Sequence, residues 1–328
     1  MIVDGHNDLL LELAFRAPEE NPFARYWLPK LRAGGVAVQV CPIYVGIEEL
    51  PELGLRRALE QVAAFHRAAR GNPADAVVVR SAADLDRLDG RVGLILALEG
   101  VEPLGYDPTL IDVFWELGVR MVGLTWNRRN PFADGLAERS PGGLSEAGRK
   151  LVTRLAERGA IIDLAHASEP TFRDVFEEVP GATIVVSHAN CRALVETRRN
   201  LSDEQLRTLA ASGGLLGLLA HPFVLDPERR TIDGYIDHID HAVELMGIEH
   251  VGIGADFTRQ IVRSGAVRIP ADALLPDGMA IDAAIDGLEG PDCFPNLVAA
   301  LERRGYAGDR LAAVLGANWL ALLRQALP

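Results

Sequence analysis

The chain alternates short apolar runs with longer segments in which apolar residues recur every three or four positions. The apolar runs are rich in β-branched residues and are continuous, which is typical of parallel strands buried on both faces. The longer segments carry apolar residues at i, i+3, i+4 and i+7, as amphipathic helices do, and several end in glycine. Strands are predicted at 2–6, 36–44, 92–99, 119–126, 160–166, 183–188, 214–221 and 250–256, and helices at 53–70, 108–118, 144–159, 171–179, 202–213, 234–247 and 311–328.

Eight strands separated by helices predict a (β/α)8 TIM barrel, and we expect one domain over residues 1–328. Two stretches fall outside this count. The segment 76–90 predicts a small extra strand and helix before the third barrel strand. The Pro- and Gly-rich segment 258–295 predicts a long loop after the eighth strand, and loops of that length usually serve a function such as a lid or a subunit contact.

The charge of the chain narrows the choice of partner. Its formal net charge is −13, which argues against nucleic acid and against an anionic membrane surface, because both attract clustered Lys and Arg. The sequence has no apolar run long enough to cross a bilayer and no recognisable signal peptide. Its three cysteines are widely spaced, as in a reducing compartment. We therefore expect a cytoplasmic protein that acts on a small molecule.

Six side chains suited to metal binding or acid/base chemistry stand at the ends of five predicted strands. Catalytic groups of a (β/α)8 barrel lie at the carboxyl ends of its strands, so these six are expected to face one mouth. A lone His-x-Asp motif would be better explained as a solvated turn. Suitable side chains at the ends of five strands are much harder to explain in that way. The six residues are His6 and Asp8, Glu99, His166, His188 and Asp256.

Glu99 follows a run of apolar and small residues with no basic neighbour nearby in sequence. Burial of such a carboxylate is costly unless a cation or good donors compensate. Imidazole and carboxylate groups are zinc ligands, and a carboxylate with two oxygens can bridge two ions. We therefore expect one ion to be held by His6, Asp8 and Glu99, and a second by Glu99, His166 and His188. The alternative is a hydrogen-bonded histidine network without metal.

Seven motifs, which cover nearly the whole chain, resemble those of the membrane (renal) dipeptidase family, peptidase family M19, in the family's order. The resemblance implies a binuclear zinc (β/α)8 barrel of the amidohydrolase superfamily that hydrolyses dipeptides and tolerates a D-residue at the carboxyl-terminal position. The family's zinc ligands fall on the five residues assigned above, with Glu99 as the bridge. The motifs are "DGHNDL", "ALEG", "DLAHAS", "VSHANCRAL", "RRNLSDEQL", "DHIDHAVELMGIEHVGIGADF" and "LGANWL".

The resemblance also implies roles for two further residues. Asp256 matches the aspartate that takes the proton during attack and passes it to the leaving amine, as general acid/base catalysis requires. Arg199 matches the arginine that binds the substrate's carboxylate, for which a guanidinium is a bidentate and permanently charged partner.

One position departs from the renal enzymes, which carry a substrate-contacting histidine where this chain has Trp126. An indole donates one hydrogen bond and accepts none, so we expect the oxyanion to be stabilised from elsewhere. Asn127, Arg128 and Arg129 are the candidates. The Trp-Asn pair resembles microbial members of the family.

This departure leaves two alternative functions open. One is hydrolysis of another small amide, such as a lactam or an N-acyl amino acid, and the other is a zinc-binding pseudoenzyme. Family members are often dimers, so a homodimer contact through 258–295 is a further expectation. Of the remaining histidines, we expect His221 to line the pocket, and His238 and His241 to cap and pack on an outer helix.

Overall fold

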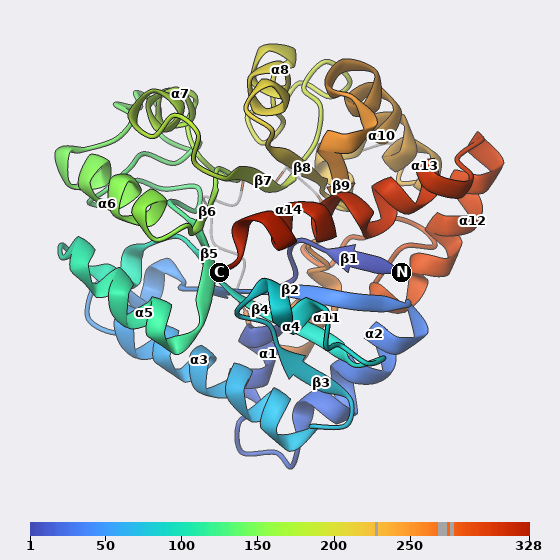
Figure 1. The fold of residues 1–328 in the computed structure, drawn as a ribbon, viewed down its shortest axis with the longest axis horizontal. Helices are drawn as coiled ribbons and strands as arrows, with labels where there is room; N and C mark the ends of the chain where they lie inside the picture. Colours follow the sequence, from blue (N-terminus) through green and yellow to red (C-terminus); the bar gives the residue numbers. More distant parts are fainter. Residues whose placement is uncertain (227–228, 268–273, 276–278) are drawn as a thin grey trace.

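Eight parallel strands close into a barrel that helices surround (Figure 1). Around the barrel the strand order is β1-β2-β4-β5-β6-β7-β8-β9, and β9 pairs with β1. The (β/α)8 prediction is confirmed, because each of the eight predicted strands overlaps one barrel strand. The strands are β1 (Ile2–Asp4), β2 (Val36–Tyr44), β4 (Val92–Glu99), β5 (Val119–Gly123), β6 (Ile161–Asp163), β7 (Ile184–Ala189), β8 (Leu215–Leu218) and β9 (Val251–Ile253).

This computed structural model describes residues 1–226, 229–267, 274–275 and 279–328. Parts of the predicted excursion 258–295, namely 268–273 and 276–278, lie outside the described residues. The extra strand and helix predicted at 76–90 are present as β3 (Ala76–Val78) and α4 (Ala82–Leu85). Strand β3 pairs with the first residues of β4, and β5 takes over that edge further along the strand.

The predicted helices between strands are confirmed, and additional short helices follow the barrel strands. Helices α6, α7 and α8 each begin after a serine that caps a free backbone N–H in the first turn. No described helix is both long and apolar enough to cross a lipid bilayer. The helices are α1 (Leu9–Phe15), α2 (Leu28–Ala33), α3 (Gly54–Gly71), α5 (Ile111–Leu117), α6 (Glu146–Glu157), α7 (Glu169–Glu178), α8 (Asp203–Ala211), α9 (Pro222–Leu225), α10 (Ile232–Met246), α11 (Arg259–Ser264), α12 (Phe294–Arg304), α13 (Gly308–Ala312) and α14 (Asn318–Ala326), with short 3₁₀ or π segments at Phe23–Trp27, Ile47–Glu49, Glu102–Leu104, Pro108–Leu110, Ile248–His250, Pro291–Cys293 and Ala313–Ala317.

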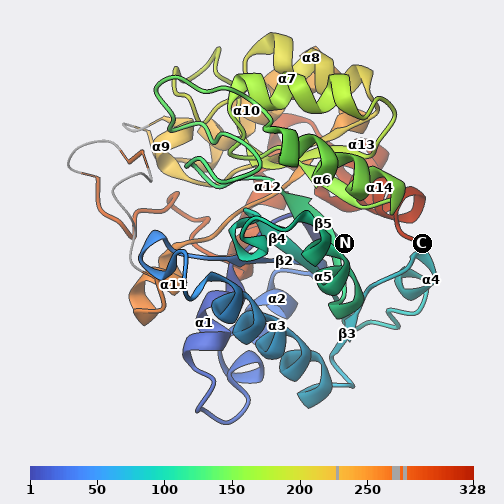
Figure 2. The same ribbon diagram turned by 90° about the vertical axis from the view of Figure 1, so that its left-hand side faces the viewer.

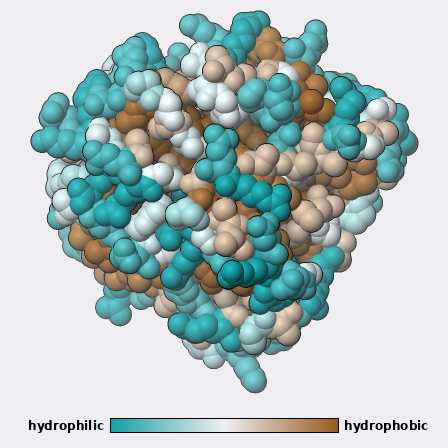
Figure 3. Space-filling model, in the orientation of Figure 1, coloured by the Kyte–Doolittle hydropathy of each residue, from teal (hydrophilic) through white to brown (hydrophobic). Residues whose placement is uncertain are grey.

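The prediction of one terminal helix over 311–328 is wrong, because the chain breaks between α13 and α14. Gly316 leaves helical geometry there with φ of 170°. It packs so closely on β1 that an added Cβ would lie 2.8 Å from the backbone nitrogen of Val3. The break lets α14 turn across the end of the barrel that faces the viewer in Figure 1. Hydrophilic and hydrophobic residues are mixed over this face (Figure 3).

The barrel interior is a core of its own, distinct from the larger core beneath the helices. Inward side chains from the barrel strands pack against Trp319 and Leu323 of α14. The Trp319 indole is fully buried and donates its N–H to the carbonyl oxygen of Ile253 at 2.9 Å. Gly5 and Gly252 make room for it, because an added Cβ would lie 2.2 Å and 2.7 Å from the indole. Helices α9 and α11 lie at the opposite end of the molecule, beside the carboxyl ends of the strands (Figure 2).

Candidate active site

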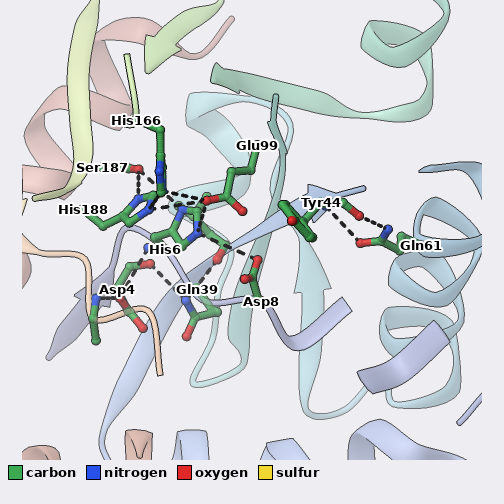
Figure 4. A network of polar contacts seen from close by, with 12 residues as sticks. Asp4, His6, Asp8, Gln39, Tyr44, Gln61, Glu99, His166, Ser187 and His188 are labelled. Atoms are coloured by element: carbon green, nitrogen blue, oxygen red, sulfur yellow. Dashed lines mark hydrogen bonds and ion pairs between the residues drawn. The ribbon is translucent and has the colours of Figure 1, made fainter. Parts of the chain in front are cut away.

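Glu99, the last residue of β4, stands at the centre of three buried histidines (Figure 4). Its Oε1 lies 3.6 Å from Nε2 of His6, 3.2 Å from Nε2 of His166 and 3.5 Å from Nε2 of His188. Asp8 completes the group, with Oδ1 3.8 Å from Nε2 of His6. In each of the two predicted ligand sets, the ligand atoms lie within 4.8 Å of one another. The structure therefore brings together the five residues predicted as metal ligands.

The backbone reaches this arrangement differently from the prediction. Strand β1 ends at Asp4 and not at residue 6 as predicted, so His6 and Asp8 lie in the loop that follows the strand. His166 and Asp256 lie three residues beyond β6 and β9 in left-handed turns, with φ of 63° and 52°. Such a conformation costs about 1–3 kcal/mol for a residue with a side chain, although His and Asp tolerate it better than most. Two of the described non-glycine residues with positive φ therefore belong to the mouth of the barrel.

The three histidines are held neutral. Burial lowers the pKa of His6 to about 3 and takes the pKa values of His166 and His188 well below their usual range. Nδ1 of His166 lies 2.6 Å from Oδ1 of Asn127, and since that oxygen only accepts, Nδ1 carries the hydrogen. Nε2 of His166 then accepts from Nη2 of Arg199 at 3.1 Å and lies 3.2 Å from Oε1 of Glu99. A neutral imidazole oriented in this way is the form that binds a metal.

Too little positive charge lies near the carboxyl groups of the site to compensate them. Burial, followed by mutual repulsion, raises the pKa values of Asp8 and Glu99 well above their usual range. Burial raises the pKa of Asp256 to about 6, while the nearby Arg199 opposes the rise. Among the described lining residues, Arg199 is the one permanently charged cation, and burial lowers its pKa to about 10. Bound cations would compensate these carboxylates, so the donor set and its charge both fit divalent metal ions.

The remaining predicted residues divide between the pocket and its surroundings. Arg199 is 4% exposed, and its Nη2 lies 3.1 Å from Nε2 of His166. Trp126 and Asn127 also line the pocket. Arg128 instead donates to the carbonyl oxygen of Val45 at 2.6 Å, and Arg129 pairs with the carboxylate of Asp134. Neither arginine lines the pocket itself, although the Arg128 guanidinium lies over the ring of the lining residue Trp126, 5.4 Å from its centroid.

The pocket contains about 760 Å³ of space, part of it open to solvent. This volume is in the range of small-molecule sites. His221 lines it, as expected. His238 and His241 lie elsewhere: His238 is buried on α10 and accepts from the backbone N–H of Cys191, and His241 contacts the Asp203 side chain, so both pack outside the pocket.

A sequence profile of the membrane dipeptidases, peptidase family M19, matches residues 1–266. The chain belongs to this family. It is therefore a metallo-dipeptidase, a hydrolase that depends on metal ions. Dipeptidase aclJ of Aspergillus oryzae is 30% identical to it over 98% of this chain and 77% of that protein. The predicted family is confirmed.

Two crystal structures resemble the whole barrel. A dipeptidase described as a metallo peptidase of family M19 is 29% identical, with a TM-score of 0.84, and the match covers 99% of this chain and 98% of that one. A metallo peptidase from Rhodobacter sphaeroides, bound to a phosphinate mimic of the dipeptide L-Ala-D-Ala, is 28% identical, with a TM-score of 0.83 and 99% coverage of both chains.

In this dipeptidase, the histidines predicted as ligands are held by residues that the sequence analysis missed. Ser187 places Oγ 2.7 Å from Nδ1 of His188. Asp4 Oδ1 accepts from the backbone N–H of Ala255 at 2.8 Å, and Asp163 Oδ1 accepts from that of Ser187 at the same distance. Each aspartate thereby ties the end of its own strand to a neighbouring strand. The available signal was a polar residue one to three positions before a histidine predicted as a ligand, in "DGH", "DLAH" and "SH".

Proposed function

We propose that this dipeptidase hydrolyses dipeptides, L,D-dipeptides included, with two zinc ions. One ion would be held by His6, Asp8 and Glu99, and the other by Glu99, His166 and His188. The observation that carries the proposal is the approach of three imidazole Nε2 atoms to one Glu99 oxygen, at 3.2 Å to 3.6 Å. Nitrogen and carboxylate ligands are those that zinc selects. The ligand of the Rhodobacter sphaeroides neighbour, a mimic of L-Ala-D-Ala, supports the L,D part.

Bound zinc ions would polarise the scissile carbonyl and make a water molecule acidic enough to attack it. Asp256 accepts the proton of the attacking water at its carboxylate and delivers it to the leaving amine. Its pKa of about 6 suits both steps near neutral pH, because the group gives up and takes back a proton easily there.

Arg199 binds the carboxylate of the substrate, for which it is buried at the wall of the pocket with its guanidinium toward the histidines. Trp126 and Asn127 complete the substrate-binding set. Trp126 lies between Tyr44 and His166, with ring centroids 5.3 Å and 5.7 Å away, so the indole forms a rigid wall beside the reacting bond.

The test combines metal content with stereochemistry. Metal-free protein is loaded with zinc, the bound metal is counted by mass spectrometry, and amino-acid release is followed for matched L,L- and L,D-dipeptides. We expect two zinc ions per chain and turnover of both series. Asp256→Asn should keep both ions and lose at least about 10²-fold in kcat, since it removes only the proton carrier. One ion in the wild-type protein would contradict the bridging role of Glu99, and loss of an ion in Asp256→Asn would make Asp256 a ligand instead.

A further inference from the structure

One side of the active-site pocket is built from apolar side chains. These residues line the same cavity as Glu99 and Arg199 but come from α1, α9, α11 and the loops around them, after β1, β8 and β9. Figure 2 shows α9 and α11 together at the mouth end of the barrel. The apolar wall consists of Leu11, Leu219, Phe223, Ile261, Val267 and Ile281.

The charged groups around this cavity already have partners in the proposed reaction. Asp8 and Glu99 belong to the metal ligands, Asp256 carries the proton, and Arg199 meets the substrate's carboxylate. Among the described lining residues there is no other Asp, Glu, Lys or Arg. A charged substrate side chain placed against the apolar wall would therefore lose its water without gaining a counter-charge, which is costly.

The two other polar groups that line the cavity near this wall are uncharged at neutral pH. Nδ1 of His221 and Oγ1 of Thr258 are buried without a hydrogen-bond partner among the described residues. Burial lowers the pKa of His221 to about 4, so its imidazole is neutral. A neutral imidazole and a hydroxyl suit the uncharged peptide groups of a substrate and give no preference for an ionised side chain.

We propose that the pocket selects dipeptides in which one side chain is apolar and packs against the wall formed by Leu11, Phe223 and Ile261. This inference rests on the proposed dipeptide hydrolysis and adds the substrate class. Discrimination of about 10- to 100-fold in kcat/KM is expected, the range that contacts in an apolar pocket provide.

The test uses side chains of nearly equal shape. The dipeptides X-Gly and Gly-X are compared with X as Leu, Asn or Asp, so that polarity and charge change while size hardly does. We expect Leu to exceed Asp in kcat/KM by at least about 10-fold in one of the series, with Asn between them. Equal rates for Leu and Asp in both series would overturn the selectivity and leave the dipeptidase activity standing. No turnover of any dipeptide would overturn both.

Two arginine variants test whether the apolar wall causes the preference for Leu over Asp. Ile281 is 53% exposed, so Ile281→Arg adds a cation at the pocket without disturbing a packed core. Val113 on α5 is 50% exposed and outside the pocket lining, so Val113→Arg is the matched control. We expect Ile281→Arg to raise the Asp-to-Leu ratio of kcat/KM by about 10-fold and the control to leave it unchanged. An unchanged ratio in Ile281→Arg, or an equal change in both variants, would overturn the proposal.

Discussion

The two ends of this barrel bury their residues for opposite reasons. At the amino-terminal end, Trp319 and Leu323 fill the interior with apolar surface, and the one indole N–H is satisfied. At the carboxyl-terminal end, the mouth buries carboxyl groups whose pKa values rise and histidines whose pKa values fall. Burial at the amino-terminal end stabilises the folded protein, because the buried surface is apolar. Burial at the carboxyl-terminal end destabilises it unless cations bind, because the buried groups are ionisable. We infer that stability and chemistry are separated along the barrel axis, and the variants below test that separation.

The largest effect is expected for Glu99→Gln. The amide keeps the shape of the side chain but removes the negative charge that two zinc ions would share. We expect kcat/KM to fall by at least about 10³-fold, or about 4 kcal/mol, with loss of bound zinc. The metal-free variant should unfold in urea no more easily than the metal-free wild type, because repulsion from Asp8 and Asp256 is removed. If metal-free Glu99→Gln is clearly less stable than the metal-free wild type, the mouth also stabilises the fold, and the contrast between the two ends is wrong.

Trp319→Ala should show the reverse pattern. Deleting a fully buried indole leaves a cavity and costs about 3–5 kcal/mol of unfolding free energy, measured by urea denaturation. Trp319→Phe is the milder partner, expected to cost about 1–2 kcal/mol through the lost hydrogen bond to Ile253. Protein that remains folded should keep kcat/KM within about threefold of wild type, since Trp319 fills the end of the barrel opposite the proposed ligands. A large loss of activity in folded Trp319→Phe would show that packing at the amino-terminal end affects catalysis at the mouth, and would contradict the separation.

The same contrast explains what the sequence predicts and what it does not. The eight strands can be predicted because each is a continuous apolar run, and the candidate ligands can be predicted because they stand where those runs end. The left-handed turn that carries Asp256 has no sequence pattern, because it is fixed by a distant contact, in which the backbone N–H of Asp256 donates to the carbonyl oxygen of His6 at 3.0 Å. The contact of Asn127 with His166 joins residues 39 positions apart and depends on a loop of irregular shape. The break at Gly316 follows from its close approach to β1, which helical periodicity cannot reveal.

Asn127 offers a smaller test within the mouth. If its Oδ1 orients His166, Asn127→Asp should retain an acceptor and remain close to wild type, whereas Asn127→Leu should weaken zinc binding by about 10- to 100-fold. Asn127 has two proposed roles, orientation of His166 and binding of the substrate. The first is measured by zinc affinity in competition with a chelator, and the second by KM for a dipeptide. A rise in KM with unchanged zinc affinity in Asn127→Leu would assign Asn127 to the substrate alone.

The smallest effect is expected at the rim, where Arg129 and Asp134 pair in the loop after β5. The Arg129 guanidinium is the main cause that holds the pKa of Asp134 below its usual value of 3.8. Because the folded pKa is depressed, the pair stabilises the protein above about pH 4 and stops doing so as the pH falls through the folded pKa. Asp134→Asn should lower the urea midpoint at pH 7 by less than Trp319→Phe does, with dipeptide hydrolysis unchanged. The difference in urea midpoint between wild type and Asp134→Asn should be constant above about pH 5 and should disappear in acid. A stability difference that widens in acid would show that the folded pKa of Asp134 is raised, as are the pKa values of the carboxyl groups of the mouth. Burial at the rim would then cost free energy, as it does at the mouth.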